Sequence, residues 1–383
     1  MNGKALPGSF DDAFQRVYRY CRECGYQGWD TFDGLSSQLF RNSPLYRMPL
    51  ARLAWCELFR GSPVNLRRAA RVPQGDHAKG LALFASGLVA RGEHGEARDL
   101  LTRLESLACP GSRGTSWGEN FDRQFRHGLT PAGIPDSVTT VFVANAMLDY
   151  HEAVGAHDLL DMAAQACRFI LGDLVLYEDG TTMCMGYLPG DAARVHNVNM
   201  LAATLLARVA RLTSNRAYLE KSRKAMRYSV KAMRPDYSWA YGEGRLQQFT
   251  DSVHTGFNLV SIKRWMEHAQ EMTWEKELRK AYRYYLDHFW LEDGCPRYYH
   301  DAVYPIDVHC SAQGIVTCLE LAGEHPDSLP LARRIARWAV DNMQDDSGYF
   351  YYQKRRAFTN RIPYMRRSQA WMFYALSRLT AAM

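Results

Sequence analysis

The fold is decided by the stretch Tyr304-Pro-Ile-Asp-Val-His-Cys-Ser-Ala-Gln-Gly-Ile-Val-Thr-Cys-Leu-Glu-Leu-Ala322, which begins as a loop and continues as a helix. Pro305 biases Tyr304 away from helical backbone angles, and Asp307 is a favourable N-cap residue. The small and apolar residues from Ser311 onward are typical of a helix that is covered on both sides. His309 therefore falls in the first helical turn, where the helix dipole disfavours an added positive charge. A neutral imidazole there can serve as an acid or a base, although the Asp307 carboxylate opposes this effect in part.

The same construction recurs along the chain at a nearly constant step. With positions 77, 137, 196, 254, 309 and 367 taken as equivalent, the steps are 60, 59, 58, 55 and 58 residues. Such a repeat predicts one supersecondary unit used several times. We expect inner helices at 77–92, 138–153, 198–212, 255–268, 310–322 and 368–381, and outer helices at 45–60, 95–108, 157–173, 216–233, 274–290 and 328–344. The predicted fold class is all-α, an (α/α)6 toroid of six helical hairpins.

Composition and length are compatible with this reading. The chain has 383 residues, of which 47% are hydrophobic and 23% charged, as in ordinary globular proteins. Length alone suggests two or three domains, but the repeat favours one barrel domain over residues 1–383, with 1–44 as an N-terminal helix and loop packed on it. No apolar run is long enough to span a bilayer. Met1 to Phe10 has no signal-peptide core and the 9 Cys read as reduced thiols, so we expect a cytoplasmic protein.

The connections between the predicted helices are strongly asymmetric. Links from inner to outer helices are short, whereas links from outer to inner helices are long and span 109–136, 174–196, 234–253, 291–308 and 345–366. In an antiparallel toroid all long loops lie at one rim, around the mouth of one cavity, and long loops usually carry function. Acidic turns followed by aromatic residues predict short β-hairpins in these loops. Aromatic rings at a pocket mouth suit the apolar faces of sugars, although we expect most of these rings only to pack the rim.

The formal net charge is +6, and the basic excess is concentrated in two groups. One group comprises Lys354, Arg355, Arg356, Arg361, Arg366 and Arg367, and the other Arg67, Arg68 and Arg71. The guanidinium group can form two parallel hydrogen bonds with a carboxylate or a phosphate, so these basic groups favour an anionic ligand. The alternative is that they are only solvated surface residues. The sequence has no zinc-finger, RNP-type or helix-turn-helix signature, so we expect no nucleic-acid partner.

Helical hairpins with long loops at the inner-helix N-termini resemble the (α/α)6-barrel sugar enzymes. That group includes N-acylglucosamine 2-epimerases, unsaturated glucuronyl hydrolases and several polysaccharide lyases. Five short sequence motifs more closely resemble barrel proteins of the VpsJ type from bacterial exopolysaccharide gene clusters. The motifs are Gly28-Trp-Asp-Thr-Phe-Asp-Gly34, Arg194-Val-His-Asn-Val-Asn199, His254-Thr-Gly-Phe-Asn258, Tyr304-Pro-Ile-Asp-Val-His309 and Ile362-Pro-Tyr-Met-Arg366. The resemblance covers nearly the whole chain. It implies an enzyme of cell-surface polysaccharide metabolism that acts on a sugar or oligosaccharide, with polysaccharide-assembly proteins as candidate partners.

Three histidines occupy matching positions on consecutive inner helices: His196, His254 and His309. Moving a proton at a sugar carbon, as in epimerisation or β-elimination, needs a base, an acid and neutralisation of the developing charge. The epimerases of the resembled group use paired histidines across the cavity. We therefore predict histidine-based acid/base chemistry on an anionic sugar or oligosaccharide.

Hydrolysis is the alternative, and it requires a pair of carboxylates. The candidate acids are Glu119, Asp122, Asp136, Glu243, Asp251 and Asp307. Asp136, Asp251 and Asp307 also suit plain N-caps, whereas Glu243 has no helix to cap and is the leading candidate among the acids. A non-catalytic glycan-binding or assembly protein is a further alternative.

The predicted substrate contacts combine aromatic rings with polar groups of the same rim. They are Trp29, Asp30, Trp117, Asn197, Asn199, Trp239, Tyr241, Tyr304, Tyr364 and Arg366. A metal site would use His309-Cys310 with Cys184 or Cys295, which resembles the zinc ligands of lanthionine cyclases in reversed order. Cys21-Arg-Glu-Cys24 has no partner pair. A full ligand set is missing in both cases, so we predict no metal and no cofactor.

Overall fold

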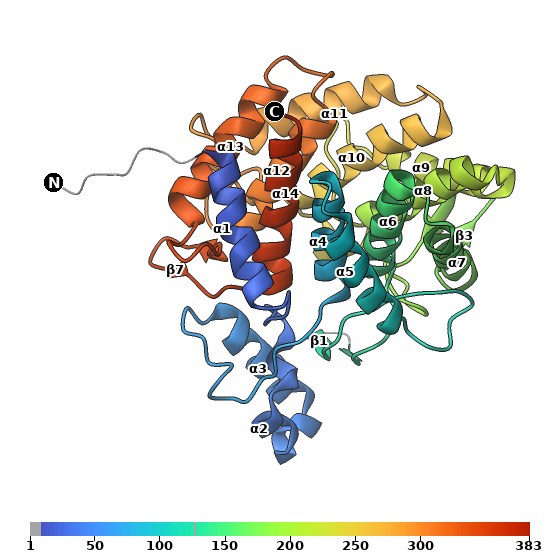
Figure 1. Ribbon diagram of the computed structural model, residues 1–383. Helices are drawn as coiled ribbons and strands as arrows, with labels where there is room; N and C mark the ends of the chain where they lie inside the picture. Colours follow the sequence, from blue (N-terminus) through green and yellow to red (C-terminus); the bar gives the residue numbers. More distant parts are fainter. Residues whose placement is uncertain (1–8, 126–127) are drawn as a thin grey trace.

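The computed structural model describes residues 9–125 and 128–383, and within this part of the chain an inner ring of six helices forms (Figure 1). These are α4 (Ala78–Ala90), α6 (Ser137–Val154), α8 (His196–Thr213), α10 (Ser252–Ala269), α12 (Val308–Glu320) and α14 (Trp371–Ala381). Each helix contacts the next, and α14 returns to α4, which closes the ring. The predicted all-α toroid is confirmed, and each inner helix begins within a few residues of its predicted equivalent position.

A second layer of helices surrounds the ring. Each of five outer helices packs on the inner helix that precedes it, namely α5 (His94–Ser106), α7 (His157–Asp173), α9 (Arg216–Lys231), α11 (Glu275–His288) and α13 (Ser328–Met343). The N-terminal helix α1 (Phe10–Glu23) takes the remaining outer place beside α14 (Figure 1). It buries Phe14 and Val17, and the Phe14 ring centroid lies 5.1 Å from that of Phe373. The two ends of the chain therefore complete the same hairpin.

The prediction that 45–60 forms the first outer helix is wrong. The helix exists as α3 (Pro49–Gly61), but it contacts the 3-10 turns η1 (Asp33–Ser36) and η2 (Pro44–Arg47) and strand β1 (Arg123–Phe125). Figure 1 shows α3 with α2 (Gln38–Arg41) below the ring. Of its residues only Phe59 is buried, whereas α1 has a full apolar stripe to pack on the ring.

All long connections lie at the end of the ring where the inner helices begin, which we call the long-loop end. Short antiparallel hairpins form there as predicted, from β1 with β2 (Gly128–Thr130), β3 (Val175–Glu178) with β4 (Met183–Met185), and β5 (Ile306–Asp307) with β6 (Gln353–Lys354) and β7 (Thr359–Asn360). The loop turns η3 (Arg245–Gln247) and η4 (Met365–Ala370) complete this end, and η4 is a turn of π-helix that leads into α14. The opposite end, where the inner helices finish, is the short-loop end.

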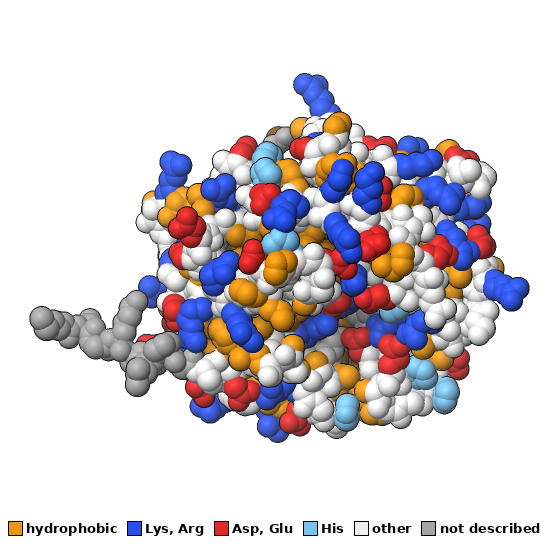
Figure 2. All heavy atoms as spheres, turned by 90° about the horizontal axis from the view of Figure 1, so that it is seen from above, with side chains coloured by type: hydrophobic (Ala, Val, Ile, Leu, Met, Phe, Trp, Pro, Cys, Tyr) orange, Lys and Arg blue, Asp and Glu red, His pale blue; other side chains and the backbone are white. Residues whose placement is uncertain are grey.

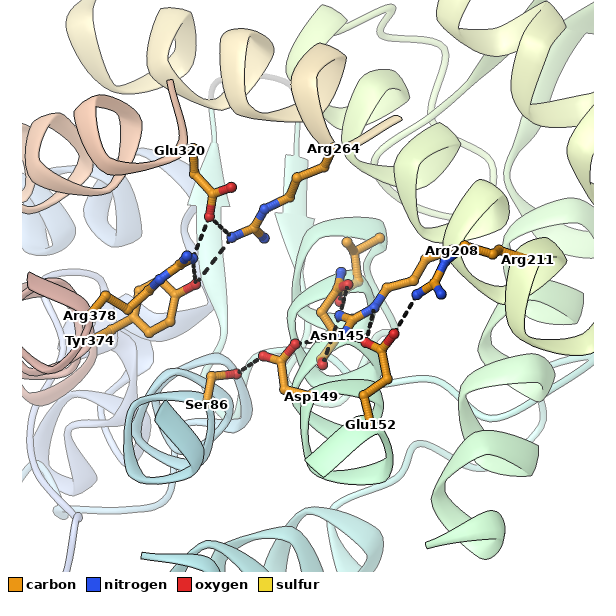
Figure 3. A network of polar contacts seen from close by, with 11 residues as sticks. Ser86, Asn145, Asp149, Glu152, Arg208, Arg211, Arg264, Glu320, Tyr374 and Arg378 are labelled. Atoms are coloured by element: carbon orange, nitrogen blue, oxygen red, sulfur yellow. Dashed lines mark hydrogen bonds and ion pairs between the residues drawn. The ribbon is translucent and has the colours of Figure 1, made fainter. Parts of the chain in front are cut away.

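Charged side chains of the inner helices pair with one another at the short-loop end (Figure 3). Two groups form, Ser86–Asp149–Arg208–Glu152–Arg211 and Arg264–Glu320–Arg378–Tyr374. Together they involve every inner helix. Burial opposes ionisation of Glu320, but Arg264 and Arg378 outweigh it and hold the pKa of this carboxyl at about 2. Such networks tie neighbouring helices together where the connecting loops are short.

Apolar side chains separate the two ends of the ring. The interior holds a narrow hollow of about 60 Å³, and the apolar residues around it include Leu83, Val141, Phe142, Leu201, Phe257, Val260, Val316 and Trp371. The toroid is therefore a packed core and not an open pore. None of the helices in the described ranges is both long and apolar enough to cross a membrane. The predicted absence of a signal peptide rests on residues 1–10, of which 1–8 lie outside the described part.

Candidate functional site at the long-loop end

His254 and Asp251 form a hydrogen-bonded pair at the start of α10. Asp251 caps the helix, because its Oδ1 accepts the backbone N–H of His254 at 2.8 Å, and its Oδ2 lies 2.6 Å from His254 Nδ1. The Asp251 side chain is fully buried, whereas that of His254 is 28% exposed. An ionised carboxylate only accepts hydrogen bonds, so it favours the tautomer with the proton on Nδ1. The Nε2 atom is then left as a free base, oriented as in catalytic triads.

His309 is buried at the start of α12 without a polar partner. Neither ring nitrogen has a hydrogen bond to any described residue. Its ring centroid lies 4.4 Å from that of Trp371 and 6.1 Å from that of Phe257. Burial lowers the pKa of His309 well below its usual value, and the positive charges of Arg367 and Lys79 add to this effect. This imidazole is therefore neutral, and it holds one donor and one acceptor that are free for a ligand.

Lys79 is a functional candidate that the sequence prediction missed. The Nζ atom lies 4.5, 5.3 and 5.7 Å from the ring centroids of Phe142, Trp371 and Phe257. Burial lowers the pKa of Lys79 to about 7, and the nearby Arg366 acts in the same direction. No carboxylate within the described ranges forms an ion pair with this amine. The sequence feature that could have indicated Lys79 is the presence of a single lysine inside the apolar run 78–85.

Arg366 joins the π-helical turn η4 to two buried acids. Its Nε and Nη2 donate to the two carboxylate oxygens of Asp30, both at 2.8 Å, and its Nη1 lies 3.3 Å from Glu119 Oε1. Burial opposes ionisation of Asp30, but Arg366 outweighs it and holds the pKa of Asp30 well below its usual range. Burial, followed by the charge of Glu119, raises the pKa of Asp136. The predicted contacts Asp30 and Arg366 thus meet, and they bring Glu119 and Asp136 with them.

Two further predicted catalytic residues lie at the starts of α8 and α12. His196 is the first residue of α8 and is buried, and burial lowers its pKa. Asp307 caps α12 by accepting the backbone N–H of His309 at 3.0 Å, and it also lies 3.4 Å from Arg367 Nη2. Asp307 therefore has a capping role whether or not it takes part in chemistry. The amide oxygen of Asn197 is buried with no hydrogen-bond partner among the described residues.

Glu243 lies on the surface. Its carboxylate is 41% exposed, lies 3.5 Å from Arg194 Nη1 and accepts a hydrogen bond from the Tyr228 hydroxyl. Its described partners are thus the guanidinium of Arg194 and the phenol of Tyr228. The second carboxylate that hydrolysis would require is not among these partners. A catalytic role for Glu243 remains a prediction without geometric support.

Most of the predicted aromatic contacts pack the rim. Three tryptophans are buried and donate their indole N–H to backbone carbonyls, namely Trp29 to Val72, Trp117 to Leu104 and Trp239 to Ser229. The buried Tyr364 hydroxyl accepts a hydrogen bond from Arg67 at 3.1 Å. Tyr304 is exposed. Tyr241 stays near the cluster, with its ring centroid 4.5 Å from that of His254.

Asn199 is a structural residue of the rim. Its amide nitrogen donates to the Ala225 carbonyl at 2.8 Å and to the Ser229 hydroxyl at 2.9 Å, and its oxygen accepts the Met185 backbone N–H at 3.0 Å. The side chain thereby ties α8 to α9 and β4. Because its hydrogen-bonding capacity is used internally, it has little left for a substrate.

Hollows are present at both ends of the ring. One of about 200 Å³ at the long-loop end is lined by Phe32, Cys56, Glu57, Arg60, Arg123 and Gln124. A larger one of about 370 Å³ at the short-loop end is lined by the paired network of Figure 3. Figure 2, seen from above the short-loop end, shows basic and acidic side chains mixed over the middle of that face. Within residues 9–125 and 128–383, no cluster of three or more His, Cys, Asp or Glu side chains could hold a metal ion.

Comparisons with known proteins agree with this architecture. No protein-family model and no curated protein matches the sequence. Among solved structures, cellobiose 2-epimerase from Bacillus thermoamylovorans is similar with a TM-score of 0.61 and 10% identity, over 80% of this chain and 88% of that one. A D-mannose isomerase is similar with a TM-score of 0.64 and 11% identity over 100% of both chains. An unsaturated glucuronyl hydrolase specific for heparin is similar with a TM-score of 0.59 and 9% identity, over 79% and 85% of the two chains.

At these identities the similarity concerns the fold, and the closer resemblance to VpsJ-type proteins stays a prediction. The overall fold is shared with an epimerase, an isomerase and a hydrolase of sugars. This chain therefore has the (α/α)6-toroid fold of the sugar enzymes that its sequence pattern resembles.

Proposed function

We propose that the protein is a carbohydrate-active enzyme that moves a proton at a carbon atom of a sugar, in an epimerisation or β-elimination. The observation that carries this proposal is the concentration of unpartnered polar atoms at the long-loop end. Within the described ranges, nine of the 17 buried side-chain atoms without a hydrogen-bond partner belong to the N-caps or first turns of inner helices or to η4, including both His309 nitrogens and Arg367 Nε. Buried polar groups are normally hydrogen-bonded. A polyhydroxylated ligand would supply the missing partners.

Three side chains take distinct roles in this proposal. His254 Nε2 is the general base, held in place by Asp251. His309, neutral and with its ring centroid 6.1 Å from that of Phe257, transfers the proton at the opposite face of the sugar. Lys79, which is partly protonated near neutral pH because its pKa is about 7, neutralises the developing negative charge. The arginines on either side of the 200 Å³ hollow favour a substrate with a carboxylate. The resemblance to exopolysaccharide-cluster proteins supports a role in polysaccharide metabolism.

Hydrogen–deuterium exchange tests this proposal directly. The protein would be incubated in D2O with a panel of uronic acids, amino sugars and short anionic oligosaccharides, and loss of a C–H signal followed by proton NMR. General-base catalysis is worth about 10²–10⁴-fold, so His254→Gln should slow exchange by that factor. His157→Gln, a change of an exposed histidine at the start of α7, is the matched control and should exchange at the parental rate. Absence of exchange with every sugar of the panel would refute proton transfer.

Hydrolysis of a glycosidic bond is the second candidate, and the Asp136–Glu119 pair favours it. Burial and the neighbouring Glu119 charge raise the pKa of Asp136, which favours the protonated form of this carboxyl. Hydrolysis requires one carboxyl that acts as the acid and a second that acts as base or nucleophile. Release of reducing sugar from an oligosaccharide, without solvent exchange at carbon, would identify this reaction. Asp136→Asn should then abolish it, whereas His254→Gln should not.

A further inference from the structure

An arm at the long-loop end exposes an unusual amount of apolar surface. The arm comprises residues 38–72 and includes α2, η2 and α3, which project below the ring in Figure 1. Its exposed large apolar side chains are Leu39, Leu45, Met48, Leu50, Leu58 and Val64. Leu50 is 79% exposed, the highest value among the large apolar residues of the described chain. Clustered exposure of this kind marks an interaction surface, whereas single exposed residues need no explanation.

Helix α3 has two distinct faces. Leu50, Ala54 and Leu58 recur at intervals of four residues and are all exposed, so they form one outward stripe. The opposite face packs on α2, η1 and β1, where the Trp55 ring stacks on Phe40 at a centroid distance of 4.6 Å and its indole N–H donates to the Gly34 carbonyl. The helix is therefore fixed to the protein by one face, and its other apolar face has no partner in the described structure.

The arm also carries most of the charge asymmetry of the protein. It contains seven arginines and one acid, Glu57, so its formal charge is 7 − 1 = +6, equal to the net charge of +6 of the whole chain. Arg67 is buried and paired with Asp33, but the arginines at 41, 47, 60, 68 and 71 are exposed. The hairpin of β6 and β7 adjoins the arm, since Asn360 Nδ2 donates to the Ser62 carbonyl at 3.1 Å. This hairpin adds exposed arginines at 355, 356 and 361.

We propose that the arm docks on an anionic lipid bilayer as a peripheral membrane anchor. Large apolar side chains on a projecting helix enter the boundary between headgroups and acyl chains, and the surrounding arginines pair with lipid phosphates. A second copy of this chain is a poor occupant of the surface, because a symmetric contact would set one +6 arm against another. No described helix can span the membrane, so the attachment is to one leaflet.

Vesicle co-sedimentation of the full chain tests this inference. The protein is expected to pellet with phosphatidylcholine vesicles that contain phosphatidylglycerol and to remain in the supernatant with phosphatidylcholine alone. Each arginine near an anionic surface contributes about fivefold to binding, so Arg47→Gln with Arg68→Gln should weaken it about 25-fold at low salt. Leu50→Ser with Leu58→Ser should weaken it at least about tenfold.

A paired variant at the short-loop end controls for general effects of charge and apolarity. Leu329 is 42% exposed and Arg216 is exposed, and they begin α13 and α9. Leu329→Ser with Arg216→Gln should bind as the parent does. Equal binding by all variants, or no binding to anionic vesicles, would overturn the proposal. So would a dimer in size-exclusion chromatography that Leu50→Ser dissociates, because the arm would then be a contact between copies.

Discussion

Replacing Lys79 by methionine is expected to make the protein more stable and less active. The lysine lies among Phe142, Phe257 and Trp371 without an ion-pair partner in the described chain. Methionine has a similar length and fills the same apolar space without a charge. The substitution therefore removes the cost of burying an amine and keeps the packing. A residue that lowers stability at a cleft, and whose removal restores it, is typical of a functional site.

The magnitude follows from the pKa. Burial lowers the pKa of Lys79 from its usual 10.5 to about 7. Each pKa unit corresponds to about 1.4 kcal/mol, so the buried amine lowers the free energy of unfolding by about 5 kcal/mol at a pH where it is protonated in both the folded and the unfolded state. Allowing for the cation–π contacts that methionine loses, we expect a gain of about 3–5 kcal/mol. For 383 residues the unfolding entropy is about 0.8 kcal/mol per degree, and the melting temperature should rise by about 4–6 °C.

The sign of the pH dependence is specific. In the folded state Lys79 releases its proton near pH 7, whereas the unfolded chain holds it up to about 10.5. Stability of the parent therefore rises with pH between these values by up to about 1.4 kcal/mol per unit. The advantage of Lys79→Met is full below pH 7 and disappears as the pH approaches 10.5.

Urea denaturation of both proteins across this range measures the difference. Lys276→Met, at an exposed position on α11, is the control and should change stability by less than about 0.5 kcal/mol at every pH. A lower stability of Lys79→Met at pH 7, or a difference that does not vary with pH, would refute the reasoning. Retention of full exchange activity by this variant would remove Lys79 from the proposed mechanism.

Three other substitutions test the packing around the site and the ring. Arg208→Met should cost about 2–3 kcal/mol in urea denaturation, because Asp149 loses its ion pair and Glu152 keeps only the one with Arg211, and the loss should shrink as the pH falls and those carboxylates are protonated. Asp30→Asn should cost about 3–5 kcal/mol by the same assay, since the buried Arg366 loses its two-pronged carboxylate partner and keeps only Glu119. Gly87→Ala should cost about 1–3 kcal/mol in thermal unfolding, because its Cβ would lie 2.7 Å from a Phe373 carbon, whereas Gly95→Ala meets nothing within 4 Å and should cost nothing.

The repeat allowed the ring to be predicted because its signal is local. Each inner helix combines a polar first turn with a weakly charged body, and both features can be read within about 20 residues of sequence. Local sequence could not show that α1, and not α3, occupies the remaining position in the outer layer. Both segments are helical by pattern, and only contacts between the two ends of the chain, such as Phe14 with Phe373, decide which one completes the outer layer.

The site was predicted less completely, for a physical reason. The contact between His254 and Asp251 can be anticipated from sequence, because both residues lie within one helical turn, and their catalytic role stays a prediction. Lys79 was missed because its meaning depends on aromatic rings from three other helices. The tryptophans were over-interpreted, since an aromatic residue in a loop looks the same in sequence whether it faces a cavity or donates to a backbone carbonyl, as Trp117 does.

Volume alone does not separate the two ends of the ring, since a hollow of about 370 Å³ lies at the short-loop end and one of about 540 Å³ lies beside Arg194 and Glu243 at the long-loop end. The arginines of the short-loop hollow are satisfied by carboxylates, as Arg208 is by Asp149 at 2.7 Å. A ligand there would have to break pairs that already stabilise the ring. At the long-loop end the same inner helices leave His309 without a partner and Lys79 partly neutral. Binding at that end would supply hydrogen bonds to these side chains, so their unpaired polar atoms, and not cavity volume, are the basis on which we propose the site there.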